Sequence, residues 1–341
     1  MSRRLILARR ALARRALALY GLAGARLRFV DHLSGTLFRV DAIAPPTLLM
    51  RIMAVDDEAL ARLRTAVRWL HALSGQTDLC VPAPRPTLDG EWLPTFDEPN
   101  GSRLVIMMVT WLDGRCCDRG LTPRHLAALG RFQGELHRHS QALGAGGATQ
   151  RSMPIGYADA VVEHGLAKGL LTARAVDLVS AAGESIDAAL RRLEADGEQA
   201  GLIHGDLHPW NVLYHGGVAA AIDFDDCGIG PYSLDMASSL VYLRCPSVGN
   251  HDHRRRYPAM AEAFLNGYAA MRTLPQDLDD QLRHGLAARQ LALLRWIVCD
   301  WPSLDLEPWA RSAVATALHE LDAYLMGRGR SPLEAAALPQ R

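Results

Sequence analysis

One polar segment in the second half of the chain constrains its fold more than any other feature. It runs Leu202-Ile203-His204-Gly205-Asp206-Leu207-His208-Pro209-Trp210-Asn211. Pro209 prevents a regular helix between Asp206 and Asn211, because proline lacks a backbone N–H and clashes with the preceding turn. We therefore expect a loop that directs Asp206 and Asn211 towards one point.

A predicted hairpin follows this loop. Two apolar runs, 212–214 and 218–222, flank the turn sequence His215-Gly216-Gly217, and this pattern is typical of two antiparallel strands. The second strand leads into Asp223. The hairpin is therefore expected to return Asp223 to the side of Asn211.

Asp206, Asn211 and Asp223 together suit phosphoryl transfer. Moving a γ-phosphoryl group requires one carboxylate at the attacking hydroxyl and oxygen ligands that hold Mg²⁺ on the phosphates. Asp206 and Asn211 have the same spacing as the aspartate and asparagine of the protein-kinase catalytic loop. A tight turn rich in aspartate and glycine is the alternative. It is the weaker interpretation, because loop, spacing, hairpin and second acidic residue occur together.

Here the chain resembles the aminoglycoside phosphotransferase and choline kinase family, whose loop runs H-G-D-x-H-x-x-N. The resemblance implies Asp206 as the catalytic base, and Asn211 and Asp223 as ligands of Mg²⁺. His204 and His208 would support the loop. The downstream sequence Gly230-Pro231-Tyr232-Ser233-Leu234-Asp235-Met236-Ala237 is also similar to the family's, and it implies that Asp235 braces the loop from a helix start.

The remaining pattern predicts an α+β class with a small β-rich lobe and a larger helical lobe, and the resemblance implies a bilobal, protein-kinase-like fold. Residues 1–110 form the expected small β-rich, nucleotide-binding N-lobe, and residues 111–341 the larger, mostly helical C-lobe with the catalytic loop and the acceptor site. In the first lobe we expect an amphipathic first helix, a hairpin over 26–40, a strand at 48–53, a helix from Asp56 and a strand at 104–110. In the second we expect helices at 122–143, 173–196, 235–243, 257–270, 275–298 and 307–325.

The resemblance implies ATP as the nucleotide, with GTP left open. The first hairpin, with Ser34 and Gly35 in its turn, would cover the phosphates. Met108, Val109 and Trp111, at the expected hinge between lobes, would contact the base.

The expected phosphate cation is unusual. Lys168 is the only lysine and belongs to the helical part, so Arg51 on the predicted strand is the candidate. A strand-edge arginine in contact with solvent is the alternative. The glutamate that pairs with this cation in relatives is replaced by Ala66; Glu58 would substitute, or Arg51 needs no partner.

The acceptor implied by the resemblance is a small-molecule hydroxyl, on an amino sugar, an amino alcohol or a hydroxy amino acid. Asp226, Tyr232, Trp296 and Asp300 are the candidate contacts, because carboxylates and aromatic faces suit a cationic ligand. For the last two, an ordinary amphipathic helix that buries Trp296 and exposes Asp300 is the favoured alternative.

Composition limits the other classes of function. The chain has 341 residues and a formal net charge of zero, so no charge excess favours nucleic acid or an anionic membrane. The sequence contains no run of 18 uncharged apolar residues, so no membrane span is expected. Six cysteines without a C-x-x-C pair predict a cytoplasmic protein, and His137 and His139 are expected to be exposed. The oligomeric state is left open.

Two alternatives to a small-molecule kinase remain. A protein Ser/Thr kinase on the same scaffold would need an activation segment, for which the interval from Phe224 to Asp235 leaves little room. A nucleotide-binding pseudokinase is favoured by Ala66 and opposed by the intact set of Asp206, Asn211 and Asp223.

Overall fold

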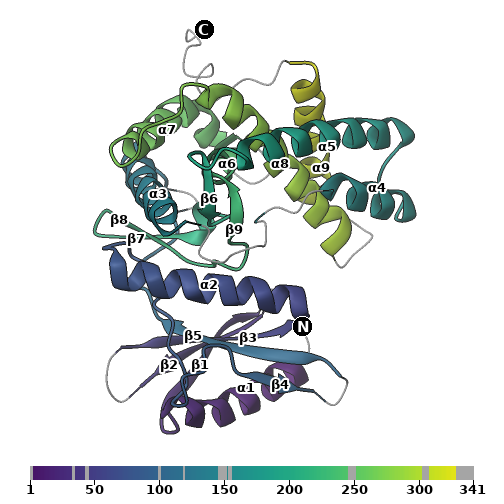
Figure 1. The fold of residues 1–341 in the computed structure, drawn as a ribbon. Coiled ribbons are helices and arrows are strands. Elements are labelled where there is room, and N and C mark those ends of the chain that lie inside the picture. Colours follow the sequence, from purple (N-terminus) through teal and green to yellow (C-terminus); the bar gives the residue numbers. More distant parts are fainter. Residues whose placement is uncertain are drawn as a thin grey trace. The chain divides into compact units, whose positions relative to one another are not determined.

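The computed structural model describes residues 3–32, 35–42, 46–98, 101–117, 120–144, 152, 156–244, 251–301 and 307–327. The chain divides into two compact units, Met1–Asp113 and Gly114–Arg341. The first is built on an antiparallel sheet and the second mostly from helices (Figure 1). The predicted α+β fold class is therefore confirmed.

The sheet of the first unit has five strands in the order β1-β2-β3-β5-β4, and every neighbouring pair is antiparallel. Two helices, the first followed by a 3₁₀ turn (Leu17–Tyr20), complete the unit. The elements are α1 (Arg3–Ala16), β1 (Arg26–His32), β2 (Thr36–Asp41), β3 (Leu48–Val55), α2 (Asp57–Gln76), β4 (Thr95–Asp97) and β5 (Arg103–Thr110).

Side-chain alternation along the strands decides which helix covers which face of the sheet. Met50, Ile52, Ile106 and Met108 pack in one apolar cluster with residues of α1 and its 3₁₀ turn. The alternate residues Met53, Val105, Met107 and Val109 pack in a second cluster with Leu60, Leu63 and Val67 of α2. The two helices consequently lie on opposite faces of the sheet (Figure 1).

The second unit contains two short two-stranded sheets and seven α-helices in its described part. β6 pairs with β9, and β7 pairs with β8, both antiparallel. The elements are α3 (Pro123–Leu143), α4 (Tyr157–Ala167), α5 (Ala173–Glu194), β6 (Ala200–Ile203), β7 (Val212–His215), β8 (Val218–Ala221), β9 (Gly228–Pro231), α6 (Tyr232–Arg244), α7 (His251–Ala269), α8 (Leu278–Arg295) and α9 (Pro308–Leu325).

Most predicted elements are found with shifts of up to three residues at their ends, but α7 begins six residues before its predicted start and α4 was not predicted. α3 begins after Thr122, whose hydroxyl accepts a hydrogen bond from the His125 N–H at 3.3 Å, as expected of an N-cap followed by proline. α6 begins three residues earlier than predicted, directly after β9, so Asp235 lies in its first turn. The pair β6 and β9 was not predicted, because both strands are four residues long and contain glycine.

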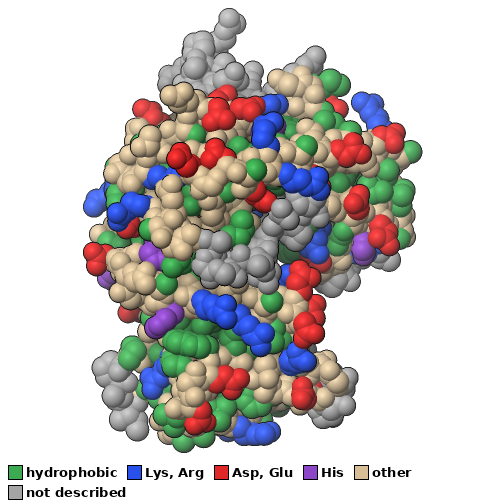
Figure 2. Space-filling model, viewed as in Figure 1, with side chains coloured by type: hydrophobic (Ala, Val, Ile, Leu, Met, Phe, Trp, Pro, Cys, Tyr) green, Lys and Arg blue, Asp and Glu red, His purple; other side chains and the backbone are tan. Residues whose placement is uncertain are grey.

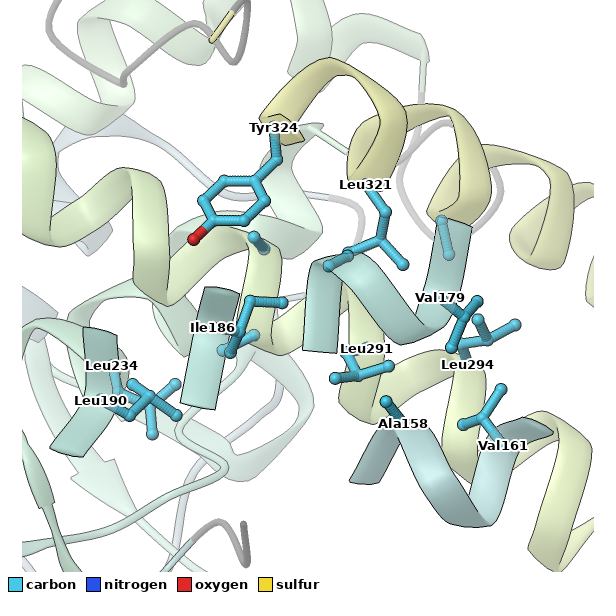
Figure 3. Packing of buried hydrophobic residues seen from close by; sticks show 14 of the residues in the cluster. Ala158, Val161, Val179, Ile186, Leu190, Leu234, Leu291, Leu294, Leu321 and Tyr324 are labelled. Atoms are coloured by element: carbon cyan, nitrogen blue, oxygen red, sulfur yellow. The ribbon is translucent and has the colours of Figure 1, made fainter. Parts of the chain in front are cut away.

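The main core of the helical unit lies where α4, α5, α8 and α9 meet. Val161, Val179, Ile186, Leu291 and Leu321 are fully buried in one cluster there (Figure 3). Each of these helices contributes apolar residues at helical spacing, so each buries one face. Figure 2 shows acidic and basic side chains interspersed on the visible surface, in agreement with the zero net charge.

Close helix crossings depend on glycine. A Cβ atom at Gly130 of α3 would overlap the carbonyl oxygen of Phe264 in α7, and one at Gly267 would overlap the carbonyl oxygen of Ala127. A Cβ at Gly285 of α8 would lie 2.9 Å from the Ser233 carbonyl oxygen in α6. These backbones pack at distances that side chains would prevent.

No helix in the part of the chain that the structure describes combines the length and the apolar character needed to cross a lipid bilayer.

The crossing of α3 and α7 yields a stability prediction. Gly130→Ala forces a methyl group into the Phe264 carbonyl, and such overpacking is expected to lower the free energy of unfolding by about 1 to 3 kcal/mol. Gly75→Ala in α2 is the control, since a Cβ there meets no atom within 4 Å; it should be neutral or stabilising by up to about 1 kcal/mol. Chemical denaturation followed by circular dichroism measures both, and equal effects would contradict the crossing.

Candidate active site

The polar segment forms an irregular loop between β6 and β7, as its proline predicted. A 3₁₀ turn, Pro209–Asn211, replaces a regular helix. Gly205 has φ +82°, and a Cβ on it would overlap the Ser152 hydroxyl and the Asp226 carbonyl oxygen. Glycine is therefore required immediately before Asp206.

The carboxylate of Asp206 is held by three side chains. Arg289 of α8 forms an ion pair with Oδ1. On the other side, Oδ2 accepts from Asn211 Nδ2 at 3.4 Å and lies 3.3 Å from His208 Nε2. Because His208 Nδ1 accepts a hydrogen bond from the Trp210 N–H at 3.2 Å, the proton of a neutral His208 ring is on Nε2, which donates to Asp206.

The charge of Asp206 is stabilised by its neighbours. Burial alone would raise the pKa of this carboxyl group, but the Arg289 guanidinium and the bond from His208 outweigh burial and lower the pKa to about 2. Asp206 is therefore ionised at neutral pH. An ionised carboxylate accepts a hydrogen bond from an acceptor hydroxyl and orients it.

A backbone hydrogen bond holds Asn211 close to the residue that precedes Asp223. The Ile222 N–H donates to the Asn211 carbonyl at 2.9 Å, which joins the end of the hairpin to the loop. The Asn211 amide nitrogen donates to the Asp206 carbonyl at 3.0 Å, so its side-chain oxygen is the atom suited to a cation. Asp223 has a φ of +65°, and it is the only non-glycine residue with a positive φ in the described part of the chain. Its side chain is exposed.

This pair fits Mg²⁺ bound together with a nucleotide. Mg²⁺ commonly takes one or two protein carboxylates and fills its other positions with phosphate oxygens and water. Among the described residues, no group of three or more His, Cys, Asp or Glu side chains could hold a metal ion. The structure therefore contains no metal site built from protein side chains of these types alone in its described part.

Asp235 ties the catalytic loop to α6, and its side chain is fully buried. Oδ1 accepts from the Gly205 N–H at 2.8 Å, and Oδ2 accepts from the His204 N–H at 3.2 Å and from His137 Nε2 at 3.0 Å. Burial opposes the charge of Asp235, but these bonds lower the pKa of the carboxyl group below its usual value. Asp235 thus braces the loop from a helix start.

His137 is the residue behind this brace, and the expectation that it is exposed was wrong. Its ring is fully buried and stacks on Tyr232 with a centroid distance of 4.5 Å. Burial lowers its pKa, so the neutral ring donates to Asp235 and accepts from the Tyr268 hydroxyl at 2.8 Å. His139 is also buried. Both lie on α3, whose apolar periodicity was the available signal.

His204 connects the loop with the hairpin. Its Nδ1 accepts from the Asp206 N–H at 3.3 Å, so the neutral ring carries its proton on Nε2 and donates to the Ile222 carbonyl at 3.0 Å. The ring also packs against Phe224 at 4.4 Å. His204 therefore fixes the distance between Asp206 and the strand that precedes Asp223.

Among the nucleotide candidates of the first unit, Arg51 and Gly35 are close to each other. Arg51 is buried on β3, and a Cβ at Gly35 would lie 3.3 Å from its Nε. Ser34 lies outside the described residues. On α2, Ala66 is buried, whereas Glu58 is exposed and pairs with Arg62 at 2.6 Å.

The three hinge candidates do not share one environment. Arg51 pairs with Met107 in the strand register, so Met107 and Val109 share its face of the sheet, whereas Met108 faces α1 and is buried there. Met108 therefore lies on the opposite face of the sheet from Arg51, and its predicted contact with the nucleotide base stays a prediction. The Trp111 N–H donates to the Thr47 carbonyl at 2.9 Å, and Arg39 stacks over the Trp111 ring at 4.7 Å.

The acceptor candidates separate into different surroundings. Asp226 has an exposed side chain between Asp223 and β9, and its backbone carbonyl lies beside Gly205. Desolvation of its carboxyl group by the surrounding protein and the Asp206 charge raise its pKa. Tyr232 is buried against His137, which leaves no surface for an acceptor. Trp296 packs with Trp301 at a ring-centroid distance of 5.3 Å, but 42% of it is exposed, so the expectation that its helix buries it was wrong. Asp300 forms an ion pair with Arg295 at 2.7 Å, so it behaves as an ordinary surface acid.

The fold and the Asp206 loop define a phosphotransferase of the protein-kinase-like class. The model of the phosphotransferase enzyme family matches residues 28–276, and the chain belongs to this family. The search of curated proteins gave no match.

Solved structures of small-molecule kinases share the fold. A microcompartment-associated aminopropanol kinase is 23% identical with a TM-score of 0.73, over 94% of this chain and 99% of that chain. An amicoumacin kinase in complex with AMP-PNP, Ca²⁺ and its ligand is 17% identical with a TM-score of 0.77, over 94% and 96%. A spectinomycin phosphotransferase in complex with ADP and spectinomycin is 13% identical with a TM-score of 0.58, over 93% and 98%.

The brace at Asp235 gives a second prediction. Asp235→Asn turns one acceptor oxygen into a donor that faces N–H groups in a buried site, so we expect a loss of about 3 to 5 kcal/mol in the free energy of unfolding. The control is Asp300→Asn, which removes a partly exposed ion pair with Arg295, and the expected loss is at most about 1 kcal/mol. Urea denaturation compares the two, and similar losses would refute the brace.

Proposed function

We propose that the protein transfers the γ-phosphoryl group of ATP to a hydroxyl group of a small molecule, with Mg²⁺ as the cofactor. The observation that carries this proposal is the set of contacts around Asp206, which keeps an ionised carboxylate beside Asn211 and the strand that leads to Asp223. Membership of the phosphotransferase enzyme family supports the class of reaction.

Each residue of the loop has one task in this proposal. Asp206 accepts a hydrogen bond from the acceptor hydroxyl, orients its oxygen towards the phosphoryl group and takes up its proton as the new bond forms. Asn211 and Asp223 would hold Mg²⁺, which neutralises charge on the β- and γ-phosphates when it is bound. His204 and Asp235 hold the loop that carries these groups.

Arg51 and the turn at Gly35 are the proposed phosphate contacts of the first unit. An arginine offers two parallel N–H groups to phosphate oxygens, and Gly35 allows the turn to pack closely beside it. Val109 and the backbone around Trp111 remain the proposed base contacts. The similar amicoumacin kinase, solved with AMP-PNP and Ca²⁺, supports a nucleotide with a divalent cation.

We propose an acceptor that carries an amino group: an amino alcohol, an amino sugar or a hydroxy amino acid. Asp226 offers an exposed carboxylate whose pKa responds to the charge of Asp206, and a cation would relieve the repulsion between the two acids. The solved structures of similar fold are named for aminopropanol, amicoumacin and spectinomycin, which supports a small molecule.

The two alternatives are less well supported. A protein kinase requires an activation segment after its metal-binding aspartate, but only residues 224–227 separate Asp223 from β9. A pseudokinase is disfavoured because Asp206, Asn211 and Asp235 keep the hydrogen bonds that hold the loop in place.

An activity assay tests the proposal. ADP release with Mg²⁺-ATP is measured against a panel of amino alcohols, aminoglycosides, hydroxy amino acids and a generic protein substrate. Acceptor-dependent ADP release with a small molecule is expected, and it should stop when Mg²⁺ is removed with EDTA. Release with the protein substrate alone would support the protein kinase, and nucleotide binding without turnover on any acceptor would support the pseudokinase.

Substitution of the central carboxylate gives a sharper prediction. Asp206→Asn should lower kcat by about 10²- to 10⁴-fold while displacement of a fluorescent ATP analogue shows unchanged nucleotide binding. Asp177→Asn, at an exposed position of α5, should leave kcat unchanged. Normal turnover by Asp206→Asn would show that Asp206 is not the catalytic base.

A further inference from the structure

Arg289 of α8 reaches the loop in a way that the sequence did not indicate. Its Nη2 forms the ion pair with Asp206 Oδ1, and its Nη1 donates to the Gly205 carbonyl at 2.8 Å. The guanidinium therefore bridges two consecutive residues of the loop. Only 13% of the Arg289 side chain is exposed, so this bridge is shielded from bulk solvent.

A close crossing of two helices places Arg289 beside the loop. Gly285 lies one helical turn before Arg289, and a Cβ there would come within 2.9 Å of the Ser233 carbonyl in α6. The missing side chain lets α8 approach α6, and α6 carries Asp235. The same two helices thus hold Gly205 from both sides, its N–H through Asp235 and its carbonyl through Arg289.

A purely structural role does not explain this arrangement well. A buried ion pair contributes little net stability, because desolvation offsets the attraction. Arg289 also keeps its Nε buried without a hydrogen-bond partner among the residues that the structure describes, which costs free energy. Other arginines of the same helix, Arg283 and Arg295, make their ion pairs at more exposed positions.

We propose that Arg289 is a positioning residue of the phosphotransfer centre, which fixes the rotamer of Asp206 and the peptide that precedes it. This inference rests on the proposed function and adds a residue to it. Arg289 touches Asp206 Oδ1, whereas His208 and Asn211 lie at Oδ2. The carboxylate plane is therefore fixed from both sides, as accurate alignment of an acceptor hydroxyl requires.

Two substitutions test this role by steady-state kinetics. Arg289→Gln removes the charge and one arm of the bridge, and we expect kcat to fall by about 10- to 100-fold. KM for ATP should change less than about twofold, because Asp206 and Arg289 are proposed to act on the acceptor. Arg289→Lys reaches only one of the two partners and should recover part of the lost kcat.

The control is Arg283→Gln on the same helix, which removes a more exposed arginine–aspartate pair away from the loop and should leave kcat unchanged. An unchanged kcat in Arg289→Gln, or a rise in KM for ATP with constant kcat, would overturn the proposal. An equal loss of kcat in Arg289→Lys and Arg289→Gln would also overturn the proposal.

A double-mutant cycle separates this proposal from the proposed function. Because Arg289 acts through Asp206, Arg289→Gln should cause no further loss of turnover in an Asp206→Asn background. The shifts in Tm of the two single variants should likewise fail to add in the double variant, and this measurement needs no acceptor. Additive Tm shifts would overturn the role of Arg289, whereas coupled shifts without acceptor-dependent turnover would overturn only the proposed function.

Discussion

The structure around the active site depends on one buried carboxylate, that of Asp235. It accepts from two successive backbone N–H groups, those of His204 and Gly205, and from the ring of His137. Without an acceptor these donors would be buried and unpaired, at a cost of about 1 to 3 kcal/mol each. This requirement fixes the start of the loop relative to α6, and the position of Asp206 follows from it.

Glycine provides the second constraint, because the helices around the loop approach one another at backbone distance. Gly130 and Gly267 allow α3 to pack on α7, and Gly285 allows α8 to pack on α6. α3 thereby brings His137 to Asp235, and α8 brings Arg289 to Asp206. The polar contacts of the site are thus a consequence of where the helices lack side chains.

Local signals made the loop predictable. The periodicity of α3 also indicated that His137 is buried, but no local signal identified the partners of His137 and Arg289. Pro209 and the glycine turn determined the loop and the hairpin, because their effects act on neighbouring residues. His137 was wrongly expected at the surface, and no sequence pattern indicated the contact of Arg289 with Asp206. The partner of each lies about 80 to 100 residues away, and no local pattern encodes such a distance.

The sequence by itself determined the α+β class, the order of the main elements and the candidate chemical groups Asp206, Asn211 and Asp223, because residue spacing and proline or glycine geometry are local properties. Only the tertiary structure decided which side chains surround those groups. It turned Tyr232 and His137 into buried supports and brought Arg289 to the carboxylate. Burial and pairing of charges depend on packing between distant helices, and packing is a property of the whole folded unit.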